Sequence, residues 1–440
     1  MLVLLAGVGL SGVAESQGGG PPEGNPPDED RATEAEVLQA DATLFPVPEY
    51  EGDLTTRAAL TGDWGGVRTG LAEESGIQIA VDVNQYYQGI LDGGLDTGSQ
   101  YSGTADFRLK LDTAKADLWA GGFLEVHAET YWGQTVNDLT GAALAVNTDP
   151  VMSLPAGNGT YLSHVVFTQF LSERFALFFG KLDTTVGDAN RFAHGVGDQR
   201  FMNLGFSFNP VLSRTSPYST LGAGFLLIPA EGLSFSFTVL DSDGTLSTSG
   251  FDTVFNGNTT YSGELIVDTE FFSKPGRHTF GFSTSTKDYR SVAQDPRIFV
   301  PALDAPVVEE DGSWAIYHNF DQYLVTDPRD PTKGWGLFGR FGLSDGNANI
   351  LHRFYSLGIG GTGIISGRDR DRFGIGYYFL QLSKNRLGLL TDDDEQGFEV
   401  FYNMSVTPWF ELSADLQVID GAGRFSDTAV VGGLRGRILF

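Results

Sequence analysis

The chain has no cysteine and few basic residues, and both shortages limit what it can do. Without cysteine no disulfide framework supports the fold, although many proteins lack cysteine and this alone excludes little. The 440 residues include 28 Lys and Arg against 56 Asp and Glu, a formal net charge of −28. Nucleic-acid binding needs clustered basic residues and is therefore disfavoured. The acidic excess predicts a hydrated surface or, alternatively, loops that bind divalent cations beside anionic lipid headgroups.

Long apolar runs are also missing. The mean hydropathy is −0.10, whereas a helical membrane protein would be far more apolar. The apolar start, Met1–Val13, is too short to span a bilayer as a helix, and small residues at Gly12-Val13-Ala14 suit a signal-peptide cleavage site. We expect residues 1–14 to be a signal peptide that lacks its basic start, 15–53 a linker rich in Pro, Gly and acid, and 54–440 the folded domain.

Motifs for catalysis or cofactor binding are absent from the sequence. It contains no G-x-x-x-x-G-K-[ST], no H-E-x-x-H and no G-x-S-x-G, and its 6 His residues have no metal-ligand spacing. Glu125 and Glu129 could imitate the acid pair of a glycoside hydrolase, but such pairs usually come from different strands. We therefore expect no enzyme activity, no cofactor and no metal.

What the chain does contain is short segments that alternate apolar and polar residues. Because successive side chains of a β-strand point to opposite faces, this alternation predicts strands with one apolar and one polar face. In residues 123–131, Leu124 and Val126 alternate with Glu125 and His127. The same pattern predicts strands at Ile77–Asn84, Phe107–Asp112, Leu233–Val239, Phe398–Val406 and Phe410–Val418.

The C-terminus repeats the pattern and ends on an aromatic residue. Arg435 and Arg437 lie on one face of the predicted last strand. The other face is small or apolar and consists of Thr428, Val430, Gly432, Leu434, Gly436, Ile438 and Phe440. The last strand of a barrel in lipid must pair with the first, because lipid tolerates no open sheet edge, and it needs such an apolar face toward the acyl chains. An ordinary edge strand of a soluble sheet could show the same pattern.

The alternation fits a soluble sandwich, with apolar faces inward, or a membrane barrel, with apolar faces outward. Here the polar faces are charged and the apolar faces often carry small residues. So many strands in a soluble domain would need a thick core of large side chains. We therefore favour an all-β fold, a transmembrane antiparallel β-barrel.

Some segments interrupt the pattern and predict irregular structure. Residues 296–332 form a long acidic stretch without clear alternation. The acidic clusters Glu309-Glu310-Asp311 and Asp392-Asp393-Asp394-Glu395 predict loops. The glycine-rich run from Gly358 to Gly363 predicts a loop or turn.

Four blocks of sequence resemble a known family. The run from Gly62 to Leu71, GDWGGVRTGL, is similar to the entry segment of the carbohydrate-selective porins of the OprB type. Blocks at 334–345, 365–378 and 399–419 resemble later family segments in the same order. Two departures, Asp420-Gly421-Ala422-Gly423 in place of a Pro-containing turn and the irregular 296–332 stretch, bear on substrate preference.

The resemblance implies a sixteen-stranded barrel in the bacterial outer membrane, through which mono- or small oligosaccharides diffuse passively. It implies sugars as solutes, outer-membrane lipid around the wall, and assembly machinery that recognises the last strand with Phe440. The barrel would be a monomer or a homotrimer. Gly62 to Gly66 would form a tight turn before the first strand, with Trp64 anchored against the barrel. The alternative function is a secreted, soluble β-rich carbohydrate-binding protein or hydrolase.

The polar faces supply the candidate substrate-binding residues. Carboxylates, amides and guanidinium groups hydrogen-bond to sugar hydroxyls, and a channel needs such sites to be weak enough to release the solute. For each residue alone, the alternative is that it simply belongs to a generic wetted wall. The lumen candidates are Asp82, Asn84, Arg108, Lys110, Glu125, His127, Glu129, Arg340, Glu399, Asn403, Asp415 and Gln417.

Overall fold

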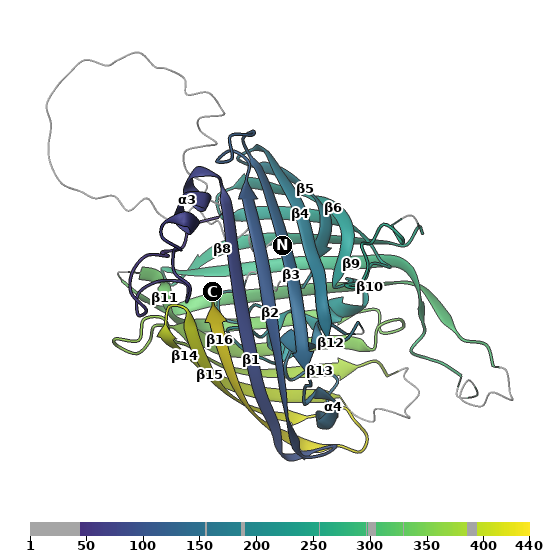
Figure 1. The fold of residues 1–440 in the computed structure, drawn as a ribbon. Coiled ribbons are helices and arrows are strands. Elements are labelled where there is room, and N and C mark those ends of the chain that lie inside the picture. Colours follow the sequence, from purple (N-terminus) through teal and green to yellow (C-terminus); the bar gives the residue numbers. More distant parts are fainter. Residues whose placement is uncertain are drawn as a thin grey trace, which may run out of the picture.

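The fold is a single closed β-barrel. A computed structural model describes residues 45–440 except 155, 186–189, 255, 296, 298–304, 329 and 385–393. Sixteen antiparallel strands each pair with their neighbours in sequence, and β1 pairs with β16 to close the wall (Figure 1). The predicted fold class is therefore confirmed. The predicted signal peptide and most of the predicted linker lie outside the described residues.

The strands have between 9 and 19 residues, and a transmembrane β-strand needs about 9–11. No helix in the described part of the chain is long and apolar enough to cross a membrane. The strands are β1 (Ile77–Gly94), β2 (Gly98–Asp112), β3 (Gly122–Gly133), β4 (Gly159–Ser172), β5 (Phe175–Asp183), β6 (Ser219–Ala230), β7 (Leu233–Asp241), β8 (Thr259–Phe271), β9 (Lys274–Arg290), β10 (Glu309–Asp327), β11 (Asp330–Ser344), β12 (Leu351–Thr362), β13 (Arg372–Leu382), β14 (Glu395–Thr407), β15 (Phe410–Asp420) and β16 (Asp427–Leu439).

Alternation along the strands sorts side chains between the two faces of the wall. On β16, Leu434 is 60% exposed on the outer face while its neighbour Arg435 is 1% exposed inside. On β1, Tyr87 lies outside and Asn84 inside. A slip of one residue would turn the inward-facing charged side chains of a strand toward the outer face, so the register is strongly specified. The apolar-out, polar-in orientation agrees with the sequence prediction.

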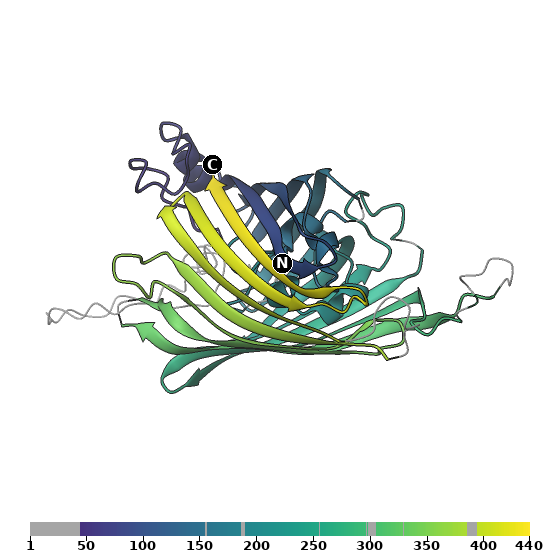
Figure 2. The same cartoon turned by 90° about the horizontal axis from the view of Figure 1, so that it is seen from below.

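The seam between the first and last strands is held by strand pairing and by hydrogen bonds from Arg68, which we call the latch. Val83 pairs with Ile438 and Asn84 with Arg437, and the Phe440 amide donates to the Val81 carbonyl at 2.8 Å. The segment before β1 ends in helix α3 (Val67–Glu74), which lies beside the C-terminal end of β16 (Figure 2). We call this end of the barrel the terminal end.

Arg68 of α3 is the centre of that latch. Its Nη2 donates to the Ile79 carbonyl of β1 at 2.8 Å and to the Phe440 carbonyl at 3.2 Å, so one guanidinium bridges the two sides of the seam. The predicted glycine turn before β1 is present, with Gly65 and Gly66 at positive φ. The prediction that Trp64 is anchored against the barrel is wrong. Its side chain is about half exposed, and its ring lies 4.9 Å from the Arg68 guanidinium.

Two aromatic residues before the predicted start of the folded domain at residue 54 contact the barrel. The Phe45 ring is buried, meets Phe123 of β3 edge-on at 5.5 Å, and lies under the Lys110 ammonium at 4.7 Å. Tyr50 is also buried and lies under Arg68 at 4.0 Å. Phe45 and Tyr50, in the predicted linker, thus pack on the terminal end of the barrel.

Several segments predicted as irregular are in fact strands. Glu309-Glu310-Asp311 begins β10, and most of the stretch 296–332 belongs to β10 and β11. Glu395, predicted to lie in an acidic loop, is the fully buried first residue of β14. Gly358, Gly360 and Gly361 belong to β12, where they leave room for aromatic rings: a Cβ on Gly358 would lie 2.4 Å from the Phe338 ring. Gly363 follows the strand at positive φ.

Candidate functional site in the barrel lumen

Two long loops from the end opposite the termini fold into the barrel. The β3–β4 loop, residues 134–158, carries helix α4 (Asn137–Thr140) and the 3-10 helix η1 (Asp149–Val151). The β5–β6 loop, residues 184–218, carries α5 (Leu204–Ser207) and the 3-10 helix η2 (Pro210–Arg214). Both contact inward-facing residues of distant strands, so they narrow the lumen.

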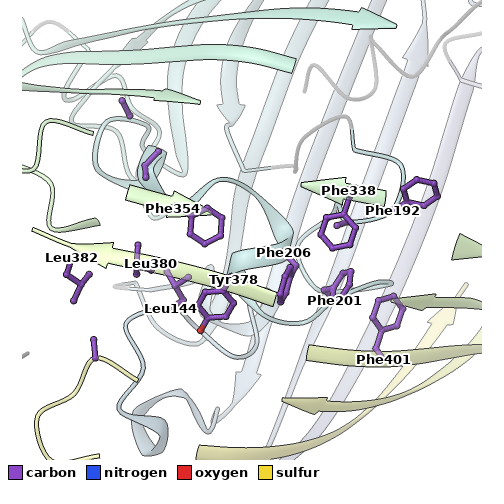
Figure 3. Close-up of a cluster of buried hydrophobic side chains, with 14 of the residues drawn as sticks. Leu144, Phe192, Phe201, Phe206, Phe338, Phe354, Tyr378, Leu380, Leu382 and Phe401 are labelled. Atoms are coloured by element: carbon purple, nitrogen blue, oxygen red, sulfur yellow. The ribbon is translucent and has the colours of Figure 1, made fainter. Parts of the chain in front are cut away.

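The β5–β6 loop is fixed by aromatic packing on the inner wall (Figure 3). The Phe201 ring lies 4.8 Å from that of Phe401 on β14 and 5.3 Å from that of Phe338 on β11. Gly374 of β13 permits this approach, because a Cβ there would lie 2.5 Å from Phe201. Apolar contacts of this kind order the loop against one side of the barrel.

Two carboxylates on the inner face of β14 each hold one loop. Glu399 accepts hydrogen bonds from the backbone amides of Met202 and Asn203 at 2.6 and 3.0 Å. Glu395 accepts from the Leu144 amide at 3.1 Å and from the Tyr378 hydroxyl at 2.9 Å. A buried carboxylate is tolerated only where such donors replace water, so these contacts specify where both loops lie.

The β3–β4 loop is held on its other side by Asp149. This carboxylate accepts from the Tyr86 hydroxyl of β1 and from Thr104 Oγ1 of β2, both at 2.6 Å. Burial raises the pKa of Asp149 well above its usual range, and the charge of Asp106 adds to that effect. The loop is thereby fixed across the lumen between β14 and β1–β2.

All the predicted lumen residues lie on the inner face, but they divide into two groups. Five lie on β11, β14 and β15: Glu399, Gln417 and Arg340 bond to loop atoms, while Asn403 and Asp415 bond to other wall residues. The remaining group lies on β1, β2 and β3 and consists of Asp82, Asn84, Arg108, Lys110, Glu125, His127 and Glu129. Contact of either group with a sugar stays a prediction.

In several ion pairs of the lumen, the arginine is accessible and the acid is hidden. The Arg108 side chain is 32% exposed, while its partner Asp82 at 3.0 Å is 8% exposed. The side chains of Arg191 and Asp321 are 25% and 1% exposed at 2.7 Å. Those of Arg372 and Glu411 are 21% and 7% exposed at 2.8 Å. At these positions the lumen offers fixed guanidinium groups to water despite the acidic composition of the chain.

Acidic groups gather instead on β2 and β3. Asp106, His127 and Glu129 bring their ligand-type atoms within 4.8 Å of one another. His127 Nε2 lies 2.7 Å from Asp106, Arg108 lies 3.2 Å from the same carboxylate, and the Tyr218 hydroxyl donates to Glu129 at 2.6 Å. Protein groups thus already bond to both carboxylates. Glu129, expected to point into water, is covered by Tyr218 of the β5–β6 loop.

Sequence comparison decides the family. The profile of the carbohydrate-selective porin family, OprB, matches residues 96–440. The chain belongs to this family. Membership identifies the barrel as an outer-membrane porin and agrees with the expectation of a channel rather than an enzyme.

Individual relatives are more distant. Porin B of Pseudomonas aeruginosa is 23% identical over 191 residues, which cover 38% of this chain and only 41% of that protein. The high-pH structure of Pseudomonas putida OprB matches with a TM-score of 0.77 at 20% identity, covering 89% of this chain and 100% of that chain. The low-pH structure of the same protein matches with a TM-score of 0.56 at 15% identity, over 88% and 100% of the two chains. These structural matches support the fold.

Sequence reasoning missed the residues that the loops bring into this porin lumen. Arg191, Asp198 and Arg200 come from the β5–β6 loop, whose sequence has neither helical nor strand periodicity. Nothing local indicates that such a loop folds inward. Arg372 and Glu411 were also missed, although both lie on inner faces of strands and could have been found by extending the alternation along β13 and β15.

Proposed function

We propose that this porin is a passive outer-membrane channel for small carbohydrates. The observation that carries the proposal is the lumen wall, where accessible guanidinium groups are fixed by buried carboxylates, as in Arg108 with Asp82. Family membership supplies the solute class. The long loops lie at the end opposite the termini, which is the extracellular end of such barrels.

The chemistry of the wall suits neutral, hydroxyl-rich solutes. Guanidinium N–H groups donate to hydroxyl oxygens, and carboxylates or amides accept from hydroxyl hydrogens. Arg108, Lys110 and Glu125 are the predicted lumen residues of β2 and β3 that keep partial exposure. Because the arginine is already paired, it needs little rearrangement to bind a hydroxyl, and the contact stays weak enough for release.

Lipid, assembly machinery and further subunits are the remaining proposed partners. The outer face carries large apolar side chains such as Leu434 and Phe107, which suits contact with acyl chains. Phe440 completes the last strand that the assembly machinery would recognise. A monomer and a homotrimer both remain open proposals.

The alternative, a soluble carbohydrate-binding protein or hydrolase, is disfavoured by the same outer face. Migration on a gel without boiling separates the two. A membrane barrel extracted in detergent should shift on heating, whereas a protein that stays soluble without detergent would contradict the channel.

Sugar binding in the lumen has its own test. In planar bilayers, added glucose should reduce the ionic current in a saturable way. Arg108→Gln should raise the half-blocking glucose concentration severalfold, while Arg174→Gln, which removes a charge from the exposed β4–β5 turn, should not. A current that glucose never reduces would argue against a binding site in the lumen.

A further inference from the structure

One guanidinium of the β5–β6 loop lacks a partner. The buried Nη1 atom of Arg200 has no hydrogen-bond partner among the described residues. Four other lumen arginines, Arg108, Arg191, Arg372 and Arg437, each have a carboxylate within 3.0 Å, and Arg435 donates to backbone carbonyls. A buried N–H group without an acceptor is costly, so Arg200, which is otherwise half-buried, would gain from an added acceptor at Nη1.

The chain around Arg200 is fixed. Arg435 Nη1 donates to the Arg200 carbonyl at 2.9 Å, and the next residue, Phe201, packs on Phe401 and over Gly374. Gly374 lies two positions from Arg372 on the same face of β13. The Arg200 side chain therefore starts from a rigid point next to a second guanidinium.

Positive charge exceeds negative charge at this point. Glu411 pairs with Arg372 at 2.8 Å, and Asp198 lies 3.9 Å from Arg437, so the nearby acids already serve other arginines. Burial, followed by the charge of Arg372, lowers the pKa of Arg200 to about 10. Burial and then the charge of Arg200 lower the pKa of His194 to about 3, so this neighbour is neutral at pH 7.

We propose that Arg200 and Arg372 form an oxyanion site in the lumen, which binds the carboxylate or phosphate group of an acidic sugar. This inference rests on the proposed channel function and deepens it, because it adds anionic sugars to the neutral ones. Guanidinium groups match both oxyanions with paired N–H donors. A neutral hydroxyl could accept one hydrogen bond there but would leave the excess positive charge uncompensated.

The test is block of single-channel current by anions. Inorganic phosphate, glucuronate and glucose 6-phosphate are titrated into planar bilayers that hold the full-length protein, at constant potassium chloride and pH 7, with glucose as the neutral comparison. We expect phosphate to block, and Arg200→Gln to raise its half-blocking concentration at least tenfold. Arg174→Gln, the matched loss of an exposed arginine, should change it less than twofold.

The outcomes separate the sources of the oxyanion and the two proposals. Equal block by all three anions would indicate recognition of the charged group alone, and stronger block by the two sugar anions would show that the sugar body contributes; both support the site. Equal half-blocking concentrations for the wild type and Arg200→Gln would overturn it, even where glucose still passes. If neither sugars nor ions pass, the channel function itself fails.

A second variant protects the test against misfolding. Heat-dependent gel migration checks each variant for a closed barrel. Should Arg200→Gln fail to insert, Arg372→Gln carries the test, since removal of the neighbouring charge should weaken phosphate block at least threefold. Unchanged block in an inserted Arg372→Gln barrel would contradict the shared site.

Discussion

At the scale of single residues, the chain controls charge by choosing which member of each ion pair reaches water. Arg108 is accessible and Asp82 is hidden, and the same holds for Arg372 and Glu411. A net charge of −28 therefore says little about the charge that a solute in the lumen meets. Neighbouring positions on one strand also differ in how much charge they tolerate, because alternate residues face lipid or lumen.

Glu125 and Val126 test that difference directly. Glu125→Gln should lower the preference for cations without changing outer-membrane yield, because this side chain keeps contact with water. Val126→Arg should reduce yield, since a charge on the lipid face costs about 2–4 kcal/mol near the midplane. Reversal potentials measure the first effect and quantitative blots of outer membranes the second. Tolerance of Val126→Arg together with loss of Glu125→Gln from the membrane would show that the two faces are assigned the wrong way round.

His194 makes the β5–β6 loop sensitive to acid. Its pKa in the folded protein is lowered to about 3, by burial first and then by Arg200, with Arg372 and Arg340 acting in the same direction and Asp198 opposing them. An unfolded loop binds the proton near pH 6.5, so the loop's stability is full above that pH and declines toward pH 3.

Limited proteolysis of the purified barrel between pH 7 and pH 4 measures this loss. Cleavage within residues 184–218 should increase as the pH falls, and His194→Gln should flatten the dependence. An identical pH profile in the wild type and the variant would exclude His194 as its source.

At the scale of elements, strands act as platforms and loops carry the specific geometry. β14 holds both inward loops through Glu395 and Glu399, while α3 holds the seam through Arg68. These contacts join segments that are far apart in sequence. Removing one of these contacts should therefore loosen the segment that it holds and leave the rest of the barrel intact.

Removing the Glu399 anchor should free the β5–β6 loop. Glu399→Ala leaves the amides of Met202 and Asn203 without acceptors, at a cost of about 1–3 kcal/mol. We expect larger fluctuations of the single-channel current, whereas Glu399→Gln keeps an acceptor and should fluctuate less. Quiet channels in the alanine variant would mean that aromatic packing alone fixes the loop.

Removing the latch should weaken the seam. Arg68→Ala loses hydrogen bonds to both Ile79 and Phe440, and we expect it to cost about 2 kcal/mol. The temperature at which the unboiled gel band converts to the unfolded band should fall, while Arg174→Ala should leave it unchanged. An unaltered conversion temperature for Arg68→Ala would show that strand pairing alone sustains closure.

Strand positions could be predicted from the sequence because alternation is local. Alternation did not predict the strand at Gly358, because this glycine makes room for the Phe338 ring and does not form a turn. It also missed the start of β10, because the acidic residues from Glu309 suggest a loop. The inward loops were beyond it. Their placement depends on Phe201 meeting Phe401 and on Glu399 meeting Met202, contacts across about two hundred residues that no local pattern encodes.

At the scale of the whole molecule, closure turns an alternating chain into a channel. The last strand must pair with the first, and Phe440 completes that pairing by donating a backbone hydrogen bond to the Val81 carbonyl. Deletion of Phe440 should therefore reduce the amount of barrel in the outer membrane. Normal levels of the truncated protein would contradict the role assigned to this end of the chain.

Liposome swelling tests the central claim, that sugars pass through this loop-narrowed lumen. Vesicles containing the purified protein are diluted into isotonic solutions of neutral sugars of increasing size, beside vesicles without protein. We expect rapid swelling in monosaccharides, a slower rate for larger sugars, and no swelling without the protein. Protein-containing vesicles that swell no faster than empty ones in every sugar would contradict it.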